Sequence, residues 1–391
     1  MLAPKLRFKE FNDEWKKVKI KEIAEVIGGG TPSTEKDCFW NGDIQWFTPS
    51  EVGKSKYVNN SQRTISREGL KNSSAKLLPT GTILLTSRAT IGEASILLHP
   101  AATNQGFQSL VPKQYMNNEF IYYLINKIEK EMKTKAFGST FLEISKTNLE
   151  NINVYTTNNN EQSKIAKFLN LLDKKIELQQ RKIEVLKMYK RGLSNKLFNQ
   201  KANSMFKECF LHMGGTALEK YVNSTGKYKF ISIGNYSSDG TYVDNNQRID
   251  NIATTTDKIL DKDNLVMVLN DKTSQGNIIG STILIDKDDL YIYNQRSERI
   301  ICNNKIIPLY AWCILNSPNF RATIFKKSQG GTQIYINFSE IEKLKLYIPN
   351  IKEQDKLSQI YISIVKKIDL EIAYFDNLKL LKKSLLQQMF I

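Results

Sequence analysis

The sequence predicts an α+β protein with a pseudo-two-fold internal repeat, in which two similar globular domains are joined by two long helices. Three observations predict this fold class: a pattern that recurs at a fixed spacing, two long heptad-patterned segments, and short β-type runs separated by polar turns. We place the first globular domain at 1–157, a central helix at 158–199, the second globular domain at 200–348 and a C-terminal helix at 349–391. A chain of 391 residues with 41% hydrophobic content is long enough for two separate cores.

The repeat is clearest where the helical segments begin. Glu161-Gln162-Ser163-Lys164-Ile165 matches Glu353-Gln354-Asp355-Lys356-Leu357 at a spacing of 192 residues, and Lys174-Lys175-Ile176 matches Lys366-Lys367-Ile368 at the same spacing. In the globular parts the spacing drifts, as expected where loops differ in length. There we expect the following equivalences: Gly29-Gly30-Thr31 with Gly214-Gly215-Thr216, Leu85 and Gly92 with Leu269 and Gly276, and Asn104-Gln105 with Asn294-Gln295.

Both helical segments carry the alternating steps of four and three residues that form a coiled-coil seam. The apolar seam positions are Ile165, Leu169, Leu172, Ile176, Ile183, Leu186, Leu193 and Leu197 in the first helix, and Leu357, Tyr361, Ile364, Ile368, Phe375, Leu378, Leu385 and Met389 in the second. The polar exceptions also match, since Gln179 and Lys190 correspond to Glu371 and Lys382.

The start of each helix is indicated by an asparagine three residues before a glutamate, Asn158 before Glu161 and Asn350 before Glu353, as in a capping box. A helix of about 40 residues would be a rod of about 60 Å. Because one chain contains both helices, we expect them to pair with each other as an antiparallel intramolecular coiled coil, with the two globular domains at opposite ends. The alternative is that the helices dimerise two chains.

The globular parts contain β-type runs such as Thr82–Thr86 and Leu265–Leu269. The net charge of +16 favours a polyanionic partner, although Lys-rich composition also occurs without one. The four cysteines show no metal or disulfide spacing, and no apolar run reaches membrane-spanning length. We therefore expect a cytoplasmic protein with no metal site and no membrane partner.

No catalytic motif is found. The chain lacks a GxxxxGK[ST] phosphate loop, and its two histidines, His99 and His212, do not lie in a catalytic or metal-binding pattern. We assign no catalytic residue.

Polar turns occur at corresponding places in both halves and carry side chains able to contact the edges of DNA bases. Turn chemistry is the simpler interpretation of each turn alone, but their pairing favours a shared binding role. The predicted DNA-binding residues are Thr31, Ser33, Ser87, Arg88, Asn104, Gln105, Ser139 and Thr140 in the first half, and Thr216, Lys272, Thr273, Asn294, Gln295, Arg296, Thr332 and Gln333 in the second.

With these features the chain resembles the specificity subunit of type I restriction-modification enzymes, over nearly its whole length. The most specific part of the resemblance runs from the Gly-Ser-Thr segment at 138–140 through Glu-Gln to Lys-Lys-Ile at 174–176, with its copy at 330–368. The resemblance implies two target-recognition domains, at 1–157 and 200–348, and two helices that act as a ruler.

The resemblance also implies a function. Each recognition domain would read one half of a bipartite, asymmetric target in double-stranded DNA, and two methyltransferase subunits would dock on the helices to methylate adenine. The chain itself would be non-catalytic and hold no cofactor: S-adenosylmethionine would belong to the methyltransferase subunits, and ATP and Mg to the restriction subunits that join for cleavage.

Two alternatives remain. The chain would be the specificity subunit of another split-target system, such as a type IIB enzyme, or a coiled-coil scaffold without sequence-specific DNA binding.

Overall fold

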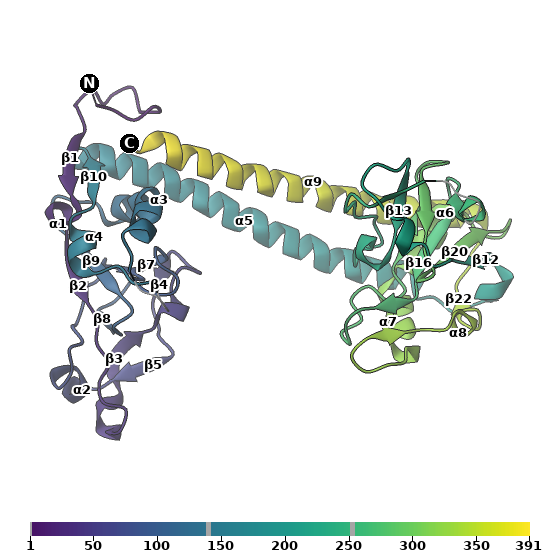
Figure 1. Cartoon of the computed structure of the whole chain (residues 1–391), viewed down its shortest axis with the longest axis horizontal. Coiled ribbons are helices and arrows are strands. Elements are labelled where there is room, and N and C mark those ends of the chain that lie inside the picture. Colours follow the sequence, from purple (N-terminus) through teal and green to yellow (C-terminus); the bar gives the residue numbers. More distant parts are fainter. Residues whose placement is uncertain (1, 138–141, 251–254) are drawn as a thin grey trace. The chain divides into compact units, whose positions relative to one another are not determined.

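The computed structural model describes residues 2–137, 142–250 and 255–391 (Figure 1). The chain divides into two compact units: unit 1 comprises Met1–Gln179 and Tyr374–Ile391, and unit 2 comprises Gln180–Ala373. Each unit contains a mixed α+β globular part and segments of both long helices. The predicted fold class is therefore confirmed.

Unit 1 has a five-stranded sheet in the order β2-β9-β6-β7-β4, a three-stranded sheet in the order β5-β3-β8, and the pair β1-β10. Helix α3 packs against β6 and β7. The strands are β1 Lys16–Lys19, β2 Ala24–Gly28, β3 Trp40–Phe47, β4 Tyr57–Val58, β5 Arg63–Ile65, β6 Ile83–Leu85, β7 Ala94–Leu97, β8 Ala101–Thr103, β9 Gln108–Pro112 and β10 Asn153–Thr156. The helices are α1 Ile20–Ile23, α2 Arg67–Lys71, α3 Asn118–Thr134, α4 Lys146–Glu150 and the start of α5 Asn159–Phe198.

Unit 2 has two four-stranded sheets, in the orders β12-β20-β16-β18 and β14-β13-β19-β15, and the pairs β11-β22 and β17-β21. The strands are β11 Ser204–Met205, β12 Phe210–Gly214, β13 Tyr228–Ile231, β14 Arg248–Ile249, β15 Ile259–Leu260, β16 Leu265–Val268, β17 Asn270–Asp271, β18 Thr282–Leu284, β19 Tyr291–Tyr293, β20 Ser297–Cys302, β21 Ile334–Tyr335 and β22 Lys345–Leu346. The helices are α6 Pro308–Leu315, α7 Pro318–Lys327, α8 Phe338–Ile341 and α9 Ile351–Met389, whose last turns belong to unit 1.

The same ladder of strand pairs occurs in each unit. The antiparallel pair β2-β9 corresponds to β12-β20, and the parallel pair β3-β8 corresponds to β13-β19. The same backbone hydrogen bond forms just after the parallel pair in both units. Asn104 N donates to Phe47 O and Asn294 N donates to Ile231 O, each at 3.1 Å. This repeated bond supports the expected equivalence of Asn104 with Asn294.

The strand register corrects two of the other expected equivalences. Gly28 faces Gln108 and Gly214 faces Glu298, so Gly214 is the equivalent of Gly28 rather than of Gly29. Gly92 N donates to Thr86 O and Gly280 N donates to Val268 O, with positive φ at both glycines, so Gly280 rather than Gly276 is the counterpart of Gly92. The expectation was wrong here because the segment between β16 and β18 is longer than the segment between β6 and β7.

Leu85 is likewise the counterpart of Met267, not of Leu269. Ile83 pairs with Leu110 in unit 1 and Leu265 pairs with Ile300 in unit 2, which aligns β6 with β16 two residues away from the expected match. Successive strand residues face opposite sides of a sheet, so a two-residue error keeps the apolar pattern and cannot be detected from hydrophobicity alone.

The long helices pack antiparallel within each unit. In unit 1 the Asp173 carboxylate on α5 pairs with Lys382 on α9 at 2.6 Å, and Lys175 lies over the Tyr374 ring at 5.5 Å. In unit 2 Lys182 pairs with Glu371 at 2.6 Å, and the Phe198 and Tyr361 rings are 5.4 Å apart. All sixteen predicted apolar seam residues are buried or half-buried. The predicted antiparallel intramolecular pairing is confirmed.

The repeated Asn, Glu and Gln residues explain how each helix begins. Asn158 Oδ1 accepts from Glu161 N and Asn350 Oδ1 accepts from Glu353 N, both at 3.0 Å, which satisfies an amide that the first turn leaves free. The next residue of the motif joins the helix to its globular part. Gln162 accepts from Asn117 N at the start of α3, and Gln354 accepts from Ile307 N at the start of α6, both at 2.9 Å.

Candidate nucleic-acid interface

Three of the predicted polar turns lie at corresponding ends of the strand ladder in each unit. They follow β2 and β6 and precede β9 in unit 1, and they follow β12 and β16 and precede β20 in unit 2, whereas Thr332 and Gln333 precede β21. Backbone hydrogen bonds join two of these turns in the same way: Ser87 N donates to Gly106 O, and Leu269 N donates to Arg296 O, each at 2.9 Å. Turns that are far apart in the sequence therefore form one edge in each unit.

In each unit a glycine allows the turn after the first strand of the ladder to lie close to the Asn-Gln turn. A Cβ atom on Gly29 would lie 2.0 Å from Asn104 O, and one on Gly215 would lie 1.9 Å from Asn294 O. No side chain fits at such distances, so the absence of a Cβ atom fixes the approach of the turn after β2 or β12 to the Asn-Gln turn.

In unit 1 the edge contains Thr31, Asn104 and Gln105. Thr31 Oγ1 donates to Gln105 Oε1 at 2.5 Å, and Asn104 Oδ1 accepts from Gly106 N at 2.9 Å. Arg88 lies on the neighbouring turn and pairs with Glu143 at 2.9 Å. Ser33 carries an exposed hydroxyl-bearing side chain, and its carbonyl accepts from Trp40 Nε1 at 3.0 Å.

In unit 2 the structure brings four of the predicted residues together in one cavity of about 350 Å³, namely Lys272, Asn294, Arg296 and Gln333. The same cavity is also lined by the polar residues Glu219, Ser232, Gln247, Asn270 and Asp271. A cavity with this many hydrogen-bonding side chains can contact the edge of a base or a phosphate.

The predicted residues differ in exposure. Ten are exposed, namely Thr31, Ser33, Gln105, Thr216, Lys272, Thr273, Gln295, Arg296, Thr332 and Gln333. Arg88 and Asn104 are half-buried, whereas Ser87 and Asn294 are buried. Ser139 and Thr140 lie outside the described residues. The hydroxyl of Thr273 donates to Asp271 at 3.0 Å and so also shapes its own loop.

Some side chains of this edge gave no signal in the sequence. Glu219 and Gln247 enter the unit 2 cavity from segments without a repeated or motif-like pattern. In unit 1 the Arg63 guanidinium lies 3.7 Å above the Trp40 ring, and Trp46 Nε1 donates to Gly30 O at 2.9 Å. These tryptophans hold the turn after β2 and place an exposed cation beside it.

Glu219 is an ionised group within the unit 2 cavity. Its carboxylate accepts from Asn294 Nδ2 at 2.9 Å and from Leu218 N at 3.1 Å. Burial alone would raise the pKa of this carboxyl, but the hydrogen bonds outweigh burial and hold the pKa below its ordinary value. Glu219 therefore carries a full negative charge at neutral pH.

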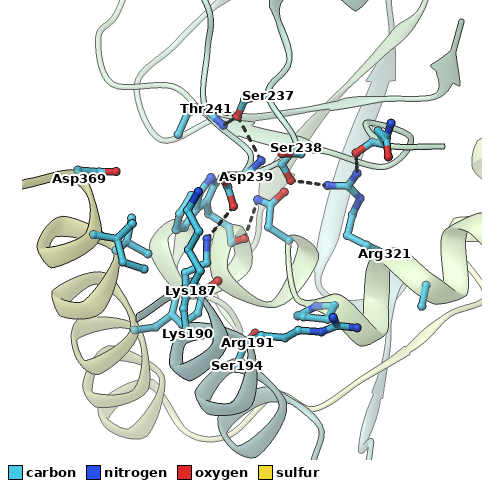
Figure 2. Close-up of a pocket in the computed structure, with 18 of the residues that line it drawn as sticks. Lys187, Lys190, Arg191, Ser194, Ser237, Ser238, Asp239, Thr241, Arg321 and Asp369 are labelled. Carbon is cyan, nitrogen blue, oxygen red and sulfur yellow. Dashed lines mark hydrogen bonds and ion pairs between the residues drawn. The ribbon is translucent and has the colours of Figure 1, made fainter. Parts of the chain in front are cut away.

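A second cavity of unit 2, of about 650 Å³, lies between α5, α9 and the globular part (Figure 2). Figure 2 shows Lys190 on α5 reaching Asp239, a contact of 2.6 Å, and Arg321 bonded to Ser238. Arg321 also donates to Ile279 O at 2.7 Å, and burial lowers its pKa to about 10, so it remains charged at neutral pH. These contacts hold the 237–241 loop against the helices and the rest of unit 2.

Within residues 2–137, 142–250 and 255–391, no cluster of three or more His, Cys, Asp or Glu is placed to bind a metal ion. Across those same ranges, no helix has both the length and the apolar content to cross a membrane.

The family match and the sequence relatives of this chain point to the same family. Residues 12–188 and 205–375 each match the family described as Type I restriction modification DNA specificity domain. A segment of 177 residues is 38% identical to the MjaIX type I restriction enzyme specificity subunit of Methanocaldococcus jannaschii, covering 44% of this chain and 41% of the relative. A segment of 197 residues is 30% identical to the EcoR124I/EcoR124II specificity subunit of Escherichia coli, covering 46% of this chain and 48% of the relative. The chain thus matches less than half the length of these two relatives.

Solved structures share the fold. The S subunit of a type I restriction-modification system from M. genitalium superposes with a TM-score of 0.58 at 18% identity, covering 100% of this chain and 99% of that one. A chain from a structure of the type I R-M system superposes with a TM-score of 0.68 at 11% identity, covering 98% and 99%.

Proposed function

Because this chain belongs to the family of type I restriction modification DNA specificity domains, we propose that it is the non-catalytic DNA-recognition subunit of a type I restriction-modification complex. The observation that carries this proposal is the duplicated edge of polar turns, one in each family match, with different side chains on the same strand ladder. A repeated scaffold with different contact residues suits the reading of two different half-sites.

We propose that unit 1 and unit 2 each bind one half of a bipartite, asymmetric target in double-stranded DNA. Helices α5 and α9 run without interruption from one unit into the other, which supports a role in fixing the number of base pairs between the half-sites. The net charge of +16 provides the affinity for phosphates, so binding should weaken as salt rises.

The partners belong to the same proposal. Exposed apolar side chains on the helices support the docking of two methyltransferase subunits: Phe168, Leu171, Leu178, Leu380 and Leu381 in unit 1, and Val185, Met188, Tyr189, Ile360 and Leu370 in unit 2. Large apolar groups on a helix surface mark a protein interface when they form a continuous patch.

S-adenosylmethionine would be held by those methyltransferase subunits, and ATP and Mg by restriction subunits that join the complex. The four cysteines are free thiols, which is consistent with assembly of the complex in the cytoplasm.

A four-residue insertion tests the spacing role. Four residues add about one helical turn, or about 6 Å, to a helix. Inserted between Gln179 and Gln180 of α5, with a matching insertion between Ala373 and Tyr374 of α9, they should lengthen the gap between the half-sites by about two base pairs, since DNA rises about 3.4 Å per base pair. Methylome sequencing of cells that express the complex would report the gap. An altered half-site sequence with an unchanged gap would overturn the spacing role.

A further inference from the structure

Two carboxylates line the unit 2 cavity. That of Asp271 is buried and accepts from Thr273 N and Ile278 N, so the carboxylate of Glu219 is the one that points to the kind of base that unit 2 reads. Glu219 lines this cavity together with Arg296 and Gln333, two of the residues predicted to contact DNA. The inference rests on the proposed function, because it assumes that DNA is the ligand of this edge.

A carboxylate is an unusual group at a DNA-binding edge. It repels phosphates, so it cannot add to backbone affinity, and it can only accept hydrogen bonds. In the major groove the acceptors of guanine, adenine N7 and thymine O4 offer it no hydrogen, whereas the exocyclic amino groups of cytosine and adenine do. An ionised Glu219 therefore discriminates between bases rather than binding DNA of any sequence.

The carboxylate is held in place for such a contact. The buried Asn294 donates to Oε1 at 2.9 Å, and the backbone of Leu218 donates to Oε2 at 3.1 Å. Asn294 is fixed in turn, because its Oδ1 accepts from Arg296 N at 3.1 Å and its own backbone N donates to Ile231 O. The exposed side chain of Gln295 also hydrogen-bonds this carboxylate. A base amino group would take the position of that side chain, since an ionised carboxylate has about four acceptor positions.

Arg296 favours the amino group of cytosine over that of adenine. Its guanidinium donors match the O6 and N7 acceptors of guanine, and guanine is the partner of cytosine. A carboxylate and a guanidinium in one cavity together complement a C·G pair, which presents a donor on one base and two acceptors on the other. An A·T pair would leave the guanidinium with a single acceptor on each base.

We propose that Glu219 accepts a hydrogen bond from the N4 amino group of a cytosine in the half-site bound by unit 2. Arg296 lies on the same cavity and contacts the paired guanine, and Asn294 is a positioning residue that holds the carboxylate. Unit 1 differs at this point, since Thr31 and Gln105 form the contact between the corresponding turns.

Glu219→Gln is the direct test, with Glu208→Gln as the matched control. Glu208 is an exposed glutamate of unit 2 outside the cavity, and it also accepts from a backbone amide, Met205 N at 2.9 Å. The full chain is expressed with its methyltransferase subunits, and the methylated motif is determined by methylome sequencing. The unit 2 half-site is identified as the half that persists when residues 1–157 are exchanged for another recognition domain.

We expect Glu219→Gln to relax one cytosine position of the unit 2 half-site by about tenfold, the effect of losing one base contact of about 1.4 kcal/mol. All other positions should be unchanged, and Glu208→Gln should keep the wild-type motif. A wild-type motif in the Glu219→Gln variant, or a change confined to the unit 1 half-site, would overturn the inference alone. A wild-type complex that methylates no defined motif would overturn the proposed function as well.

A second measurement has its main comparison on the wild-type protein, so that comparison does not depend on how the variant folds. The wild-type complex is titrated with a duplex in which the required cytosine is replaced by 2-pyrimidinone, which lacks the N4 amino group. Binding should weaken about tenfold relative to the unmodified duplex, and Glu219→Gln should show no such difference. Equal binding of both duplexes by the wild-type complex would contradict the assignment.

Discussion

The strand ladders of unit 1 and unit 2 repeat closely, whereas the turns at their edges do not. Five residue pairs join β2 to β9 and five join β12 to β20, and the glycine that follows the first strand makes the same close approach in both units. At the edge, Thr31 contacts Gln105 in unit 1, but Asn294 contacts Glu219 in unit 2. The two units therefore share a backbone ladder but carry different side chains at its edge, as the proposed reading of two different half-sites requires.

The largest effect is expected at the shared glycines. Gly29→Ala and Gly215→Ala should each destabilise their own unit by about 4 kcal/mol, because a Cβ atom would overlap a backbone oxygen. Denaturant unfolding combined with amide hydrogen exchange would assign each loss to a unit. Gly192→Ala on α5, where a Cβ atom meets nothing within 4 Å, should instead stabilise by about 0.5–1 kcal/mol. A much smaller loss of stability for one of the two glycine substitutions would show that the backbones of the two units are not equivalent at this position.

The helix seam gives the next largest effect. Leu169 is fully buried in unit 1, so Leu169→Ala should cost about 3 kcal/mol. Leu171 is 62% exposed on the same helix, and Leu171→Ala should cost less than about 0.5 kcal/mol. Thermal unfolding measures both values. If Leu171 proved as costly as Leu169, the helix face assigned to partner docking would instead be part of the core.

The ion pairs made by the equivalent lysines Lys382 and Lys190 should differ in how much they stabilise the protein. Lys382 pairs with Asp173, whose side chain is 24% exposed and also accepts from the Tyr123 hydroxyl at 2.6 Å. Lys190 pairs with Asp239, whose side chain is 64% exposed. We expect Lys382→Met to cost about 1.5 kcal/mol and Lys190→Met about 0.5 kcal/mol. Equal losses in chemical denaturation would contradict this difference between the units.

The smallest effect is expected in the pH dependence of the stability of unit 2. Hydrogen bonds from Arg248 hold the pKa of Asp244 in unit 2 well below its ordinary value of 3.8. A carboxyl with a lowered folded pKa stabilises the protein above its unfolded pKa, and this stabilisation is lost as the pH falls through the folded value. Asp244→Asn should therefore destabilise unit 2 at pH 7, by an amount that shrinks below about pH 4. A loss that stays constant from pH 7 to pH 3 would rule out this linkage.

The helical part of the fold was predictable from the sequence because each helix repeats its pattern over ten seam positions, at 165–197 and 357–389. The seam positions, the matching polar exceptions and the Asn158 and Asn350 caps all rest on fixed spacings, and local chemistry determines them. The globular equivalences were not predictable to the residue. Short apolar strands match each other at several registers, and only the hydrogen-bonded partner, such as Gln108 for Gly28, decides among them.

The candidate interface was predictable in part for a related reason. Turns rich in Asn, Gln and Thr can be recognised locally, and four predicted residues from three of the turns in unit 2 do share one cavity. Glu219 and Gln247 join that cavity only through the fold, since neither belongs to a repeated segment. The assignment of individual residues to DNA contacts stays a prediction.

The assignment of one half-site to each unit can be tested by exchanging residues 1–157 for another recognition domain. Methylome sequencing of cells carrying this chain with its methyltransferase subunits is then compared before and after the exchange. We expect a bipartite, asymmetric motif in which the exchange replaces one half and leaves the other half and the gap unchanged. A continuous motif, or an exchange that alters both halves, would contradict the claim that each unit reads its own half-site.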